Sequence, residues 1–195
     1  MLLSSQSFAT IVYSNTTTDT LDTISYQANG FTQIGDQVHL AGTDRLATLA
    51  TVQLFNSGSA GTINTTFRLF NVGLPVGTQI GPDFVLTGVA APAADIFNVS
   101  FSLPNLLVPD DLIFTVQIDG SSAGVQIIGL DMFEPPTVGS SDASFAIAHN
   151  GTNLVQVGTA TENVFFELNA ASVPEPATLG LAGAALLGLI LRRRK

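Results

Sequence analysis

The sequence predicts an all-β fold, a β-sandwich or jelly-roll-like ectodomain, followed by one short C-terminal transmembrane helix. The chain of 195 residues is rich in Thr, Ser, Asn, Gly, Val and Phe, and it is poor in the straight-chain helix formers Lys, Glu and Arg. Apolar and polar residues alternate with a period of two in several segments. Turn-forming residues recur about every ten residues, which is typical of sandwiches and jelly rolls.

The alternation is clearest in residues 50–54, 97–103 and 114–118. Seven further strands are predicted at residues 9–13, 37–41, 67–70, 84–89, 125–130, 144–148 and 164–168. Pairs such as Asn29-Gly30 and Asp119-Gly120 bound these strands and indicate turns. A local repeat relates residues 52–56 to residues 67–71. We interpret the two segments as similar strands that pack on the same core, and the flexible turn between them predicts that they are neighbouring antiparallel strands.

The charge is distributed unevenly along the chain. Residues 1–176 contain two cations, Arg45 and Arg68, against all fifteen acids, so their formal charge is −13. Such a body cannot neutralise a row of phosphates, which excludes a nucleic-acid partner and a polybasic contact with anionic lipid. The absence of cysteine excludes disulfides, thiolate catalysis and Cys-based zinc sites.

Three segments follow from these patterns. Residues 1–9 lack the basic start and the apolar core of a complete signal peptide, but Ser7-Phe8-Ala9 has small residues at the two positions that a signal peptidase reads. We therefore interpret residues 1–9 as the remnant of a signal peptide, with the mature chain beginning near Thr10. Residues 10–172 form the predicted ectodomain, and residues 173–195 form a tail of different composition.

The tail contains an uncharged segment at residues 177–191, followed by a basic end, Arg192, Arg193, Arg194 and Lys195. A helix of this length would measure roughly 22 Å, which is shorter than the ~30 Å hydrocarbon core but can be accommodated by local thinning of the bilayer. A buried core helix is the alternative, although such a helix would show a polar face. The positive-inside bias predicts a cytoplasmic basic end and an acidic body on the opposite side of the inner membrane.

The residues before this segment are Val173-Pro174-Glu175-Pro176, which predict an extended, accessible linker. The order Pro-Glu-Pro, short Gly/Leu/Ala span and terminal arginine cluster resembles the PEP-CTERM sorting signal. The resemblance implies that exosortase, a membrane-embedded cysteine protease of bacteria that make extracellular polysaccharide, recognises Pro174, Glu175 and Pro176 and processes the tail. These three residues would then be a substrate motif. An ordinary tail anchor and a glycolipid-anchor signal are the alternatives, but the latter is not normally closed by arginines.

Candidate catalytic residues are few. His39 is interpreted as a strand-face residue and His149 as a turn residue, and the body contains no Gly-x-Ser-x-Gly elbow. Tyr13 and Tyr26 are the candidates for stacking on a sugar ring. The densest acidic group could be a solvated rim, a calcium site or a pair of hydrolytic carboxylates, and it comprises Asp110, Asp111, Asp119, Asp131 and Glu134.

Taken together, the sequence predicts an exported cell-surface or extracellular-matrix protein without catalytic activity or cofactor. It would be held transiently in the inner membrane and processed by exosortase. The resemblance further implies a structural or adhesive role in association with extracellular polysaccharide. A carbohydrate-binding module, with or without calcium, is the alternative, and a glycan-active hydrolase comes after it.

Overall fold

The computed structural model describes residues 9–26, 31–73, 77–141, 146–149, 154–157 and 163–173, and every regular element among them is a β-strand. The all-β prediction is therefore confirmed. The predicted transmembrane helix at residues 177–191, the sorting residues Pro174, Glu175 and Pro176, and the basic end at residues 192–195 lie outside the described residues. Within the described ranges, no helix has the length and apolar character needed to cross a membrane.

The first of two sheets is built around β4 (Leu46–Asn56). β7 (Asp95–Leu107) pairs antiparallel with one edge of β4 over nearly its whole length. The opposite edge of β4 pairs with β14 (Phe166–Ala171) in its first half and with β9 (Ile127–Phe133) in its second half. The remaining strands of this sheet pair with β14 or β9, and they are β1 (Thr10–Asn15), β2 (Asp19–Ser25) and β13 (Asn163–Val164).

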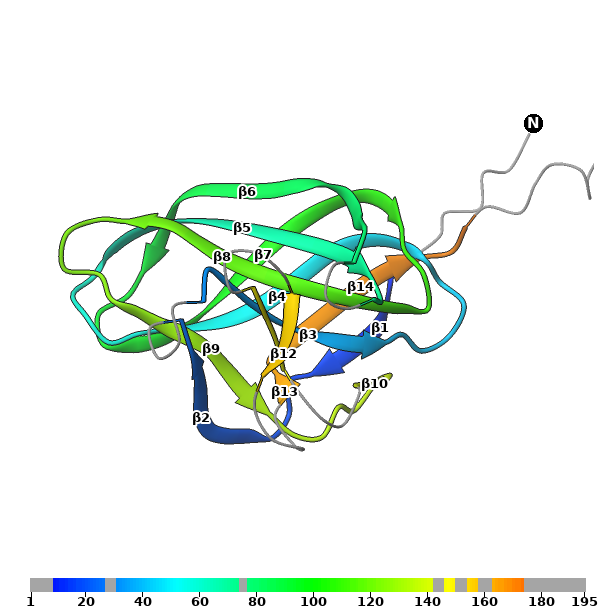
Figure 1. Ribbon diagram of the computed structural model, residues 1–195, viewed down its shortest axis with the longest axis horizontal. Helices are drawn as coiled ribbons and strands as arrows, with labels where there is room; N and C mark the ends of the chain where they lie inside the picture. Colours follow the sequence, from blue (N-terminus) through cyan, green and yellow to red (C-terminus); the bar gives the residue numbers. More distant parts are fainter. Residues whose placement is uncertain are drawn as a thin grey trace, which may run out of the picture.

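The second sheet has β8 (Asp111–Ser121) near its centre, between β3 (Gln33–His39) and β5 (Gly61–Asn71). β6 (Gln79–Ala91) pairs with the free edge of β5. At the other side, β3 pairs with two short strands, and the sheet is completed by β10 (Ser140–Ser141), β11 (Ala146–His149) and β12 (Leu154–Val157). All the ladders in both sheets are antiparallel, and Figure 1 shows how the long strands are arranged.

The two sheets face each other across a core of phenylalanine rings. Phe67 and Phe114 come from the second sheet, whereas Phe101 and Phe166 come from the first. The rings of Phe114 and Phe166 stack with centroids 3.8 Å apart, and Phe67 stacks on Phe101 at 5.1 Å. All four are at most 1% exposed. Because the inward positions of the alternating strands carry these rings, the period of two in the sequence is what builds the sandwich.

The predicted pairing of residues 52–56 with residues 67–71 is wrong. The first segment lies in β4 and the second in β5, and these strands belong to different sheets. The connection between them passes from one sheet to the other at Ser57–Ala60, where Gly58 N donates to the side chain of Asn56 at 3.0 Å. The two segments resemble each other because both contribute large apolar residues to the same core, Leu54 and Phe67 among them.

Candidate functional site

The C-terminal strand β14 determines where the tail leaves the body. It lies between β1 and β4, and its last residue, Ala171, pairs with Leu46, which in turn pairs with Leu107 at the end of β7. Two residues later the described chain ends at Val173, which is 47% exposed. We call this end of the sandwich, where β14 and β7 end and β4, β6 and β8 begin, the exit end; it lies on the right in Figure 1.

A shallow hollow of about 600 Å³ opens at the exit end. Its walls come from the β3–β4 and β7–β8 connections, the β5–β6 region and the start of the tail, and it is lined by Arg45, Asn71, Gln79, Ile80, Leu107, Val108, Pro109 and Val173. Val108 N donates to Arg45 O at 2.9 Å, which ties the two connections together. The first residue of the predicted tail is thus part of a wall of the folded body.

Three polar side-chain pairs lie at the exit end. Arg45 Nε donates to Asp110 Oδ1 at 2.7 Å, and His39 Nδ1 lies 2.7 Å from Asp111 Oδ1. Thr10 Oγ1 donates to Asp44 Oδ2 at the same end. Two of the five acids singled out in the sequence therefore sit at the exit end, each beside a basic partner. His39 is the exposed last residue of β3, as its interpretation as a strand residue requires.

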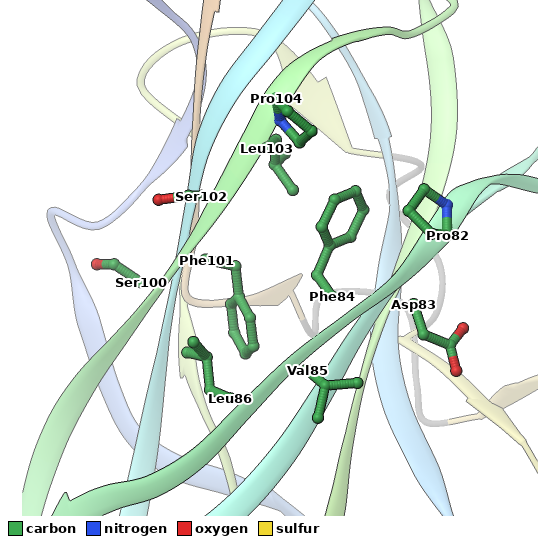
Figure 2. Close-up of a pocket in the computed structure, with 10 residues that line it drawn as sticks. All are labelled: Pro82, Asp83, Phe84, Val85, Leu86, Ser100, Phe101, Ser102, Leu103 and Pro104. Carbon is green, nitrogen blue, oxygen red and sulfur yellow. The ribbon is translucent and has the colours of Figure 1, made fainter.

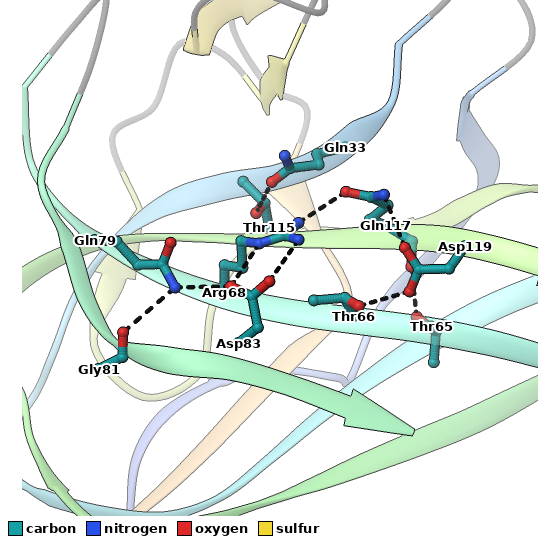
Figure 3. Close-up of polar contacts among 10 residues, drawn as sticks. All are labelled: Gln33, Thr65, Thr66, Arg68, Gln79, Gly81, Asp83, Thr115, Gln117 and Asp119. Atoms are coloured by element: carbon teal, nitrogen blue, oxygen red, sulfur yellow. Dashed lines mark hydrogen bonds and ion pairs between the residues drawn. The ribbon is translucent and has the colours of Figure 1, made fainter. Parts of the chain in front are cut away.

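The third predicted acid, Asp119, belongs to a polar network on the outer face of the second sheet (Figure 3). Gln117 Nε2 donates to Asp119 Oδ1, and Thr66 Oγ1 donates to Asp119 Oδ2. Arg68 donates to Gln117 Oε1 and, with two nitrogens at 2.8 Å each, to both oxygens of Asp83. These hydrogen bonds lower the pKa of Asp83. The polar groups of this network form hydrogen bonds and an ion pair with one another, and these contacts link β5, β6 and β8.

The remaining two acids lie around the end of β9. Asp131 is 3% exposed and accepts a hydrogen bond from Thr23 Oγ1 at 3.0 Å. Burial raises its pKa, and the charge of Asp19 acts in the same direction. Glu134 follows β9, and its backbone N donates to Thr18 O. The five acids are therefore divided among three places, and in the described part of the chain no three His, Cys, Asp or Glu side chains are grouped to hold a metal ion.

A groove of about 530 Å³ separates the edge strands β6 and β7, which belong to different sheets (Figure 2). Phe84 and Phe101 project into the space between these strands, and Leu86 and Leu103 extend its apolar lining. Asp83 points away from the rings, toward Arg68. Pro82 and Pro104 interrupt the two edges, which is a common protection of edge strands against pairing with another chain.

The two tyrosines singled out in the sequence have different environments. Tyr13 is 0% exposed and packs on Phe166 with ring centroids 5.6 Å apart, so it cannot stack on a sugar. Tyr26 lines a pocket of about 380 Å³ together with Phe31, Gln117, Gln126 and neighbouring residues. Its hydroxyl donates to Val116 O at 2.9 Å. His149, interpreted as a turn residue, is instead the last residue of β11 and pairs with Gln33 and Leu154.

A family model, described as the PEP-CTERM protein-sorting motif, matches residues 172–195. This chain carries a PEP-CTERM sorting motif. The motif indicates an exported protein that exosortase processes, and it confirms the resemblance to the PEP-CTERM sorting signal stated above. Comparisons with curated proteins and with solved structures give no match to the chain.

The PEP-CTERM motif begins directly where the fold ends. β14 ends at Ala171, and the match starts at residue 172. The motif could be located from the sequence because its residues are continuous. The hollow beside the junction could not be located in this way, because its lining residues come from five separate segments of the chain. The apolar pair Leu106-Leu107, placed after the edge-breaking Pro104, is the one local signal that pointed to an exposed apolar strand end.

Proposed function

We propose that this protein is a non-catalytic structural or adhesive component of the extracellular polysaccharide layer. It is held at the inner membrane by residues 177–191 and is then freed by exosortase within or next to Pro174–Pro176. The observation that carries the proposal is the junction at Ala171: a cut anywhere in the linker removes no strand and breaks no described ladder. The mature body would keep its whole core.

The acid placement supports a role without catalysis. Asp110, Asp111 and Asp119 are each hydrogen bonded to a neighbouring side chain, and Asp131 lies apart from them in a different sheet. A hydrolytic pair requires two carboxyl groups that face one bond from about 5 to 9 Å apart. The outer face of the first sheet instead displays hydroxyl and amide pairs, Thr51 with Ser100 and Gln53 with Asn98, which suit a hydrated polysaccharide matrix.

C-terminal peptide mapping by mass spectrometry tests the processing step. Protein from the native host should be mapped separately in the cell-bound and the released fraction. The released fraction should end near Glu175 or Pro176 and should lack the four terminal cations. A mature pool that still ends at Lys195 would contradict the proposal.

A matched pair of variants sharpens this test. Glu175→Ala changes the motif and should leave the chain uncut and cell-bound. Glu167→Ala removes a carboxylate of β14, eight residues away, and should be processed like the wild type. Equal processing of the two variants would show that exosortase does not recognise Glu175.

Carbohydrate binding is the second candidate, and the pocket beside Tyr26 favours it. Two aromatic residues, Tyr26 and Phe31, line this pocket with the exposed amide side chain of Gln126, a combination suited to a sugar ring and its hydroxyls. Titration of the protein with fragments of the host polysaccharide should show binding that Phe31→Ala weakens. Phe55→Ala, on the outer face of the first sheet, is the control and should leave the affinity unchanged.

A further inference from the structure

Exposed apolar side chains gather at the end of the sandwich from which the tail leaves. The described residues include eight large apolar side chains that are clearly exposed, and three of them lie at the exit end. We call these three the exit patch, and they are Val72, Leu107 and Val173. Single exposed apolar residues are normal on a protein surface, whereas a group at one end indicates a contact.

The patch surrounds the hollow already described. Leu107 is 62% exposed and Val173 47%, and both line the hollow with Ile80, Val108 and Pro109. Val72 follows Asn71, which is another residue of the lining. The patch therefore lies beside the point at which the tail begins.

The length of the linker limits how far this patch can be from a membrane. Three residues, Pro174, Glu175 and Pro176, separate Val173 from the apolar segment at residues 177–191. Four residue steps of a Pro-rich chain span about 12 Å, whereas the headgroup layer alone is about 5 to 7 Å thick. While the tail is inserted, the exit end must face the bilayer at close range.

We propose that, before processing, the exit patch rests on the lipid surface that surrounds the inserted tail. This inference rests on the proposed function, because it requires residues 177–191 to act as an anchor. Leu107 and Val173 reach the boundary between headgroups and acyl chains, as apolar side chains of interfacial proteins do.

The charges at the exit end select the kind of lipid. Asp110 pairs with Arg45, Asp111 pairs with His39, and Asp44 accepts from the uncharged Thr10. These three acids outnumber the two basic side chains, so the rim is negative. An anionic lipid surface would repel this rim. The proposed partner is therefore a surface rich in zwitterionic phosphatidylethanolamine.

The experiment uses the full chain, with its tail, reconstituted into phosphatidylethanolamine-rich vesicles. Because the chain has no cysteine, single-cysteine variants can be labelled at one site with an environment-sensitive fluorophore. Leu107→Cys reports on the exit patch. Ala93→Cys is the matched control in the exposed β6–β7 turn, roughly 40 Å away along thirteen-residue strands.

A nitroxide carried on the lipid headgroup should quench the label at position 107 and leave the label at position 93 unchanged. Val72→Cys, a second exit position that is 45% exposed, should behave like position 107. Equal and weak quenching at positions 107 and 93 would overturn the inference. A label at 107 that is shielded from water but not quenched by lipid would also overturn it, and would indicate a second copy on the patch.

Flotation of the same vesicles separates this inference from the proposed function. Chains that float with the vesicles but show no quenching at position 107 would leave the anchor intact and overturn only the docking of the patch. Chains that fail to float would overturn the anchor and the docking together.

Discussion

Asn56 shows how much of this fold depends on one polar side chain. It is 0% exposed, and its amide nitrogen donates to Ser59 O and Pro92 O. Its oxygen accepts hydrogen bonds from Gly58 N and Gln126 N. A single buried amide thus connects the β4–β5, β6–β7 and β8–β9 turns at the end opposite the tail.

Asn56→Asp should lower the free energy of unfolding by several kcal/mol. The carboxylate keeps both acceptors but loses both donors, which leaves two carbonyls facing a buried negative charge, and each lost partner costs about 1–3 kcal/mol. Asn98→Asp is the control, because Asn98 is exposed and its oxygen can still accept from Gln53 Nε2. Urea unfolding measures both variants. Equal midpoints would contradict the structural role of Asn56.

The pairing of Arg68 with Asp83 predicts a dependence on pH. The hydrogen bonds from Arg68 hold the pKa of Asp83 below its ordinary value of 3.8. A carboxyl whose pKa is lowered on folding stabilises the fold above pH ~3.8, and it loses that contribution as the pH falls through the folded value. Arg68→Gln should therefore raise the pKa of Asp83, as followed by carbon NMR of the carboxyl group. The variant also loses the hydrogen bond to Gln117, so it should be less stable than the wild type, and the difference in stability should shrink as the pH falls through the folded pKa of Asp83. An unchanged titration would show that Arg68 does not set this pKa.

The pKa of Asp131 is shifted in the opposite direction from the pKa of Asp83. Burial raises its pKa, while the hydroxyl of Thr23 partly offsets this effect. Thr23→Val removes the hydrogen bond with little change in volume and should raise the pKa of Asp131 further. A carboxyl with a raised pKa favours folding below its unfolded value, and this contribution is lost as the pH rises through the folded value. The same NMR titration decides the outcome, and a lower pKa in the variant would contradict it.

At the scale of elements, the strands that alternate strongly were predicted from the sequence, and their partners were not. Residues 97–103 and 114–118 lie within β7 and β8. β2 was missed because its pattern is exposed at Asp19–Asp22 and half-buried afterwards, so it has no alternation to detect. The false pairing of β4 with β5 has a different cause, since similar strands can face each other across a core as readily as they can lie side by side.

The candidate site was likewise only partly predictable. The motif at Pro174–Pro176 is continuous in the chain and was found, whereas the exit hollow joins residues as distant as Arg45 and Val173. Spacing along the sequence also grouped five acids that the strands separate, because β8 and β9 belong to different sheets. Proximity in a β-sandwich is determined by topology, and alternation within one strand contains no information about it.

β14 should be indispensable to the fold, and the residues after it should not be. A chain ending at Val173 retains every described ladder and should unfold cooperatively with the midpoint of the full-length protein. A chain ending at Phe165 lacks the partner of both β1 and β4, together with Phe166 and Leu168 of the core, and should show no cooperative transition. Circular dichroism during heating distinguishes the two. A folded shorter chain would contradict the central place of β14.

For the whole molecule, processing should change the net charge more than the shape. The full chain carries a formal charge of −9, whereas residues 1–176 carry two cations and fifteen acids, which gives −13. The processed protein should therefore elute later from an anion-exchange column than the full-length chain at neutral pH. Coincident elution would indicate that the basic end is still attached.

The position of β14 also imposes an order on biogenesis. A strand that is inserted between the first strand and the fourth cannot pair until nearly the whole polypeptide has been delivered to one compartment. If residues 177–191 insert as proposed above, the last strand emerges just as that segment reaches the membrane, because only a short linker separates the two. Closure of the sandwich and arrest of translocation would then be nearly simultaneous. Until β14 is in place, β1 and β4 each lack a strand partner along one edge.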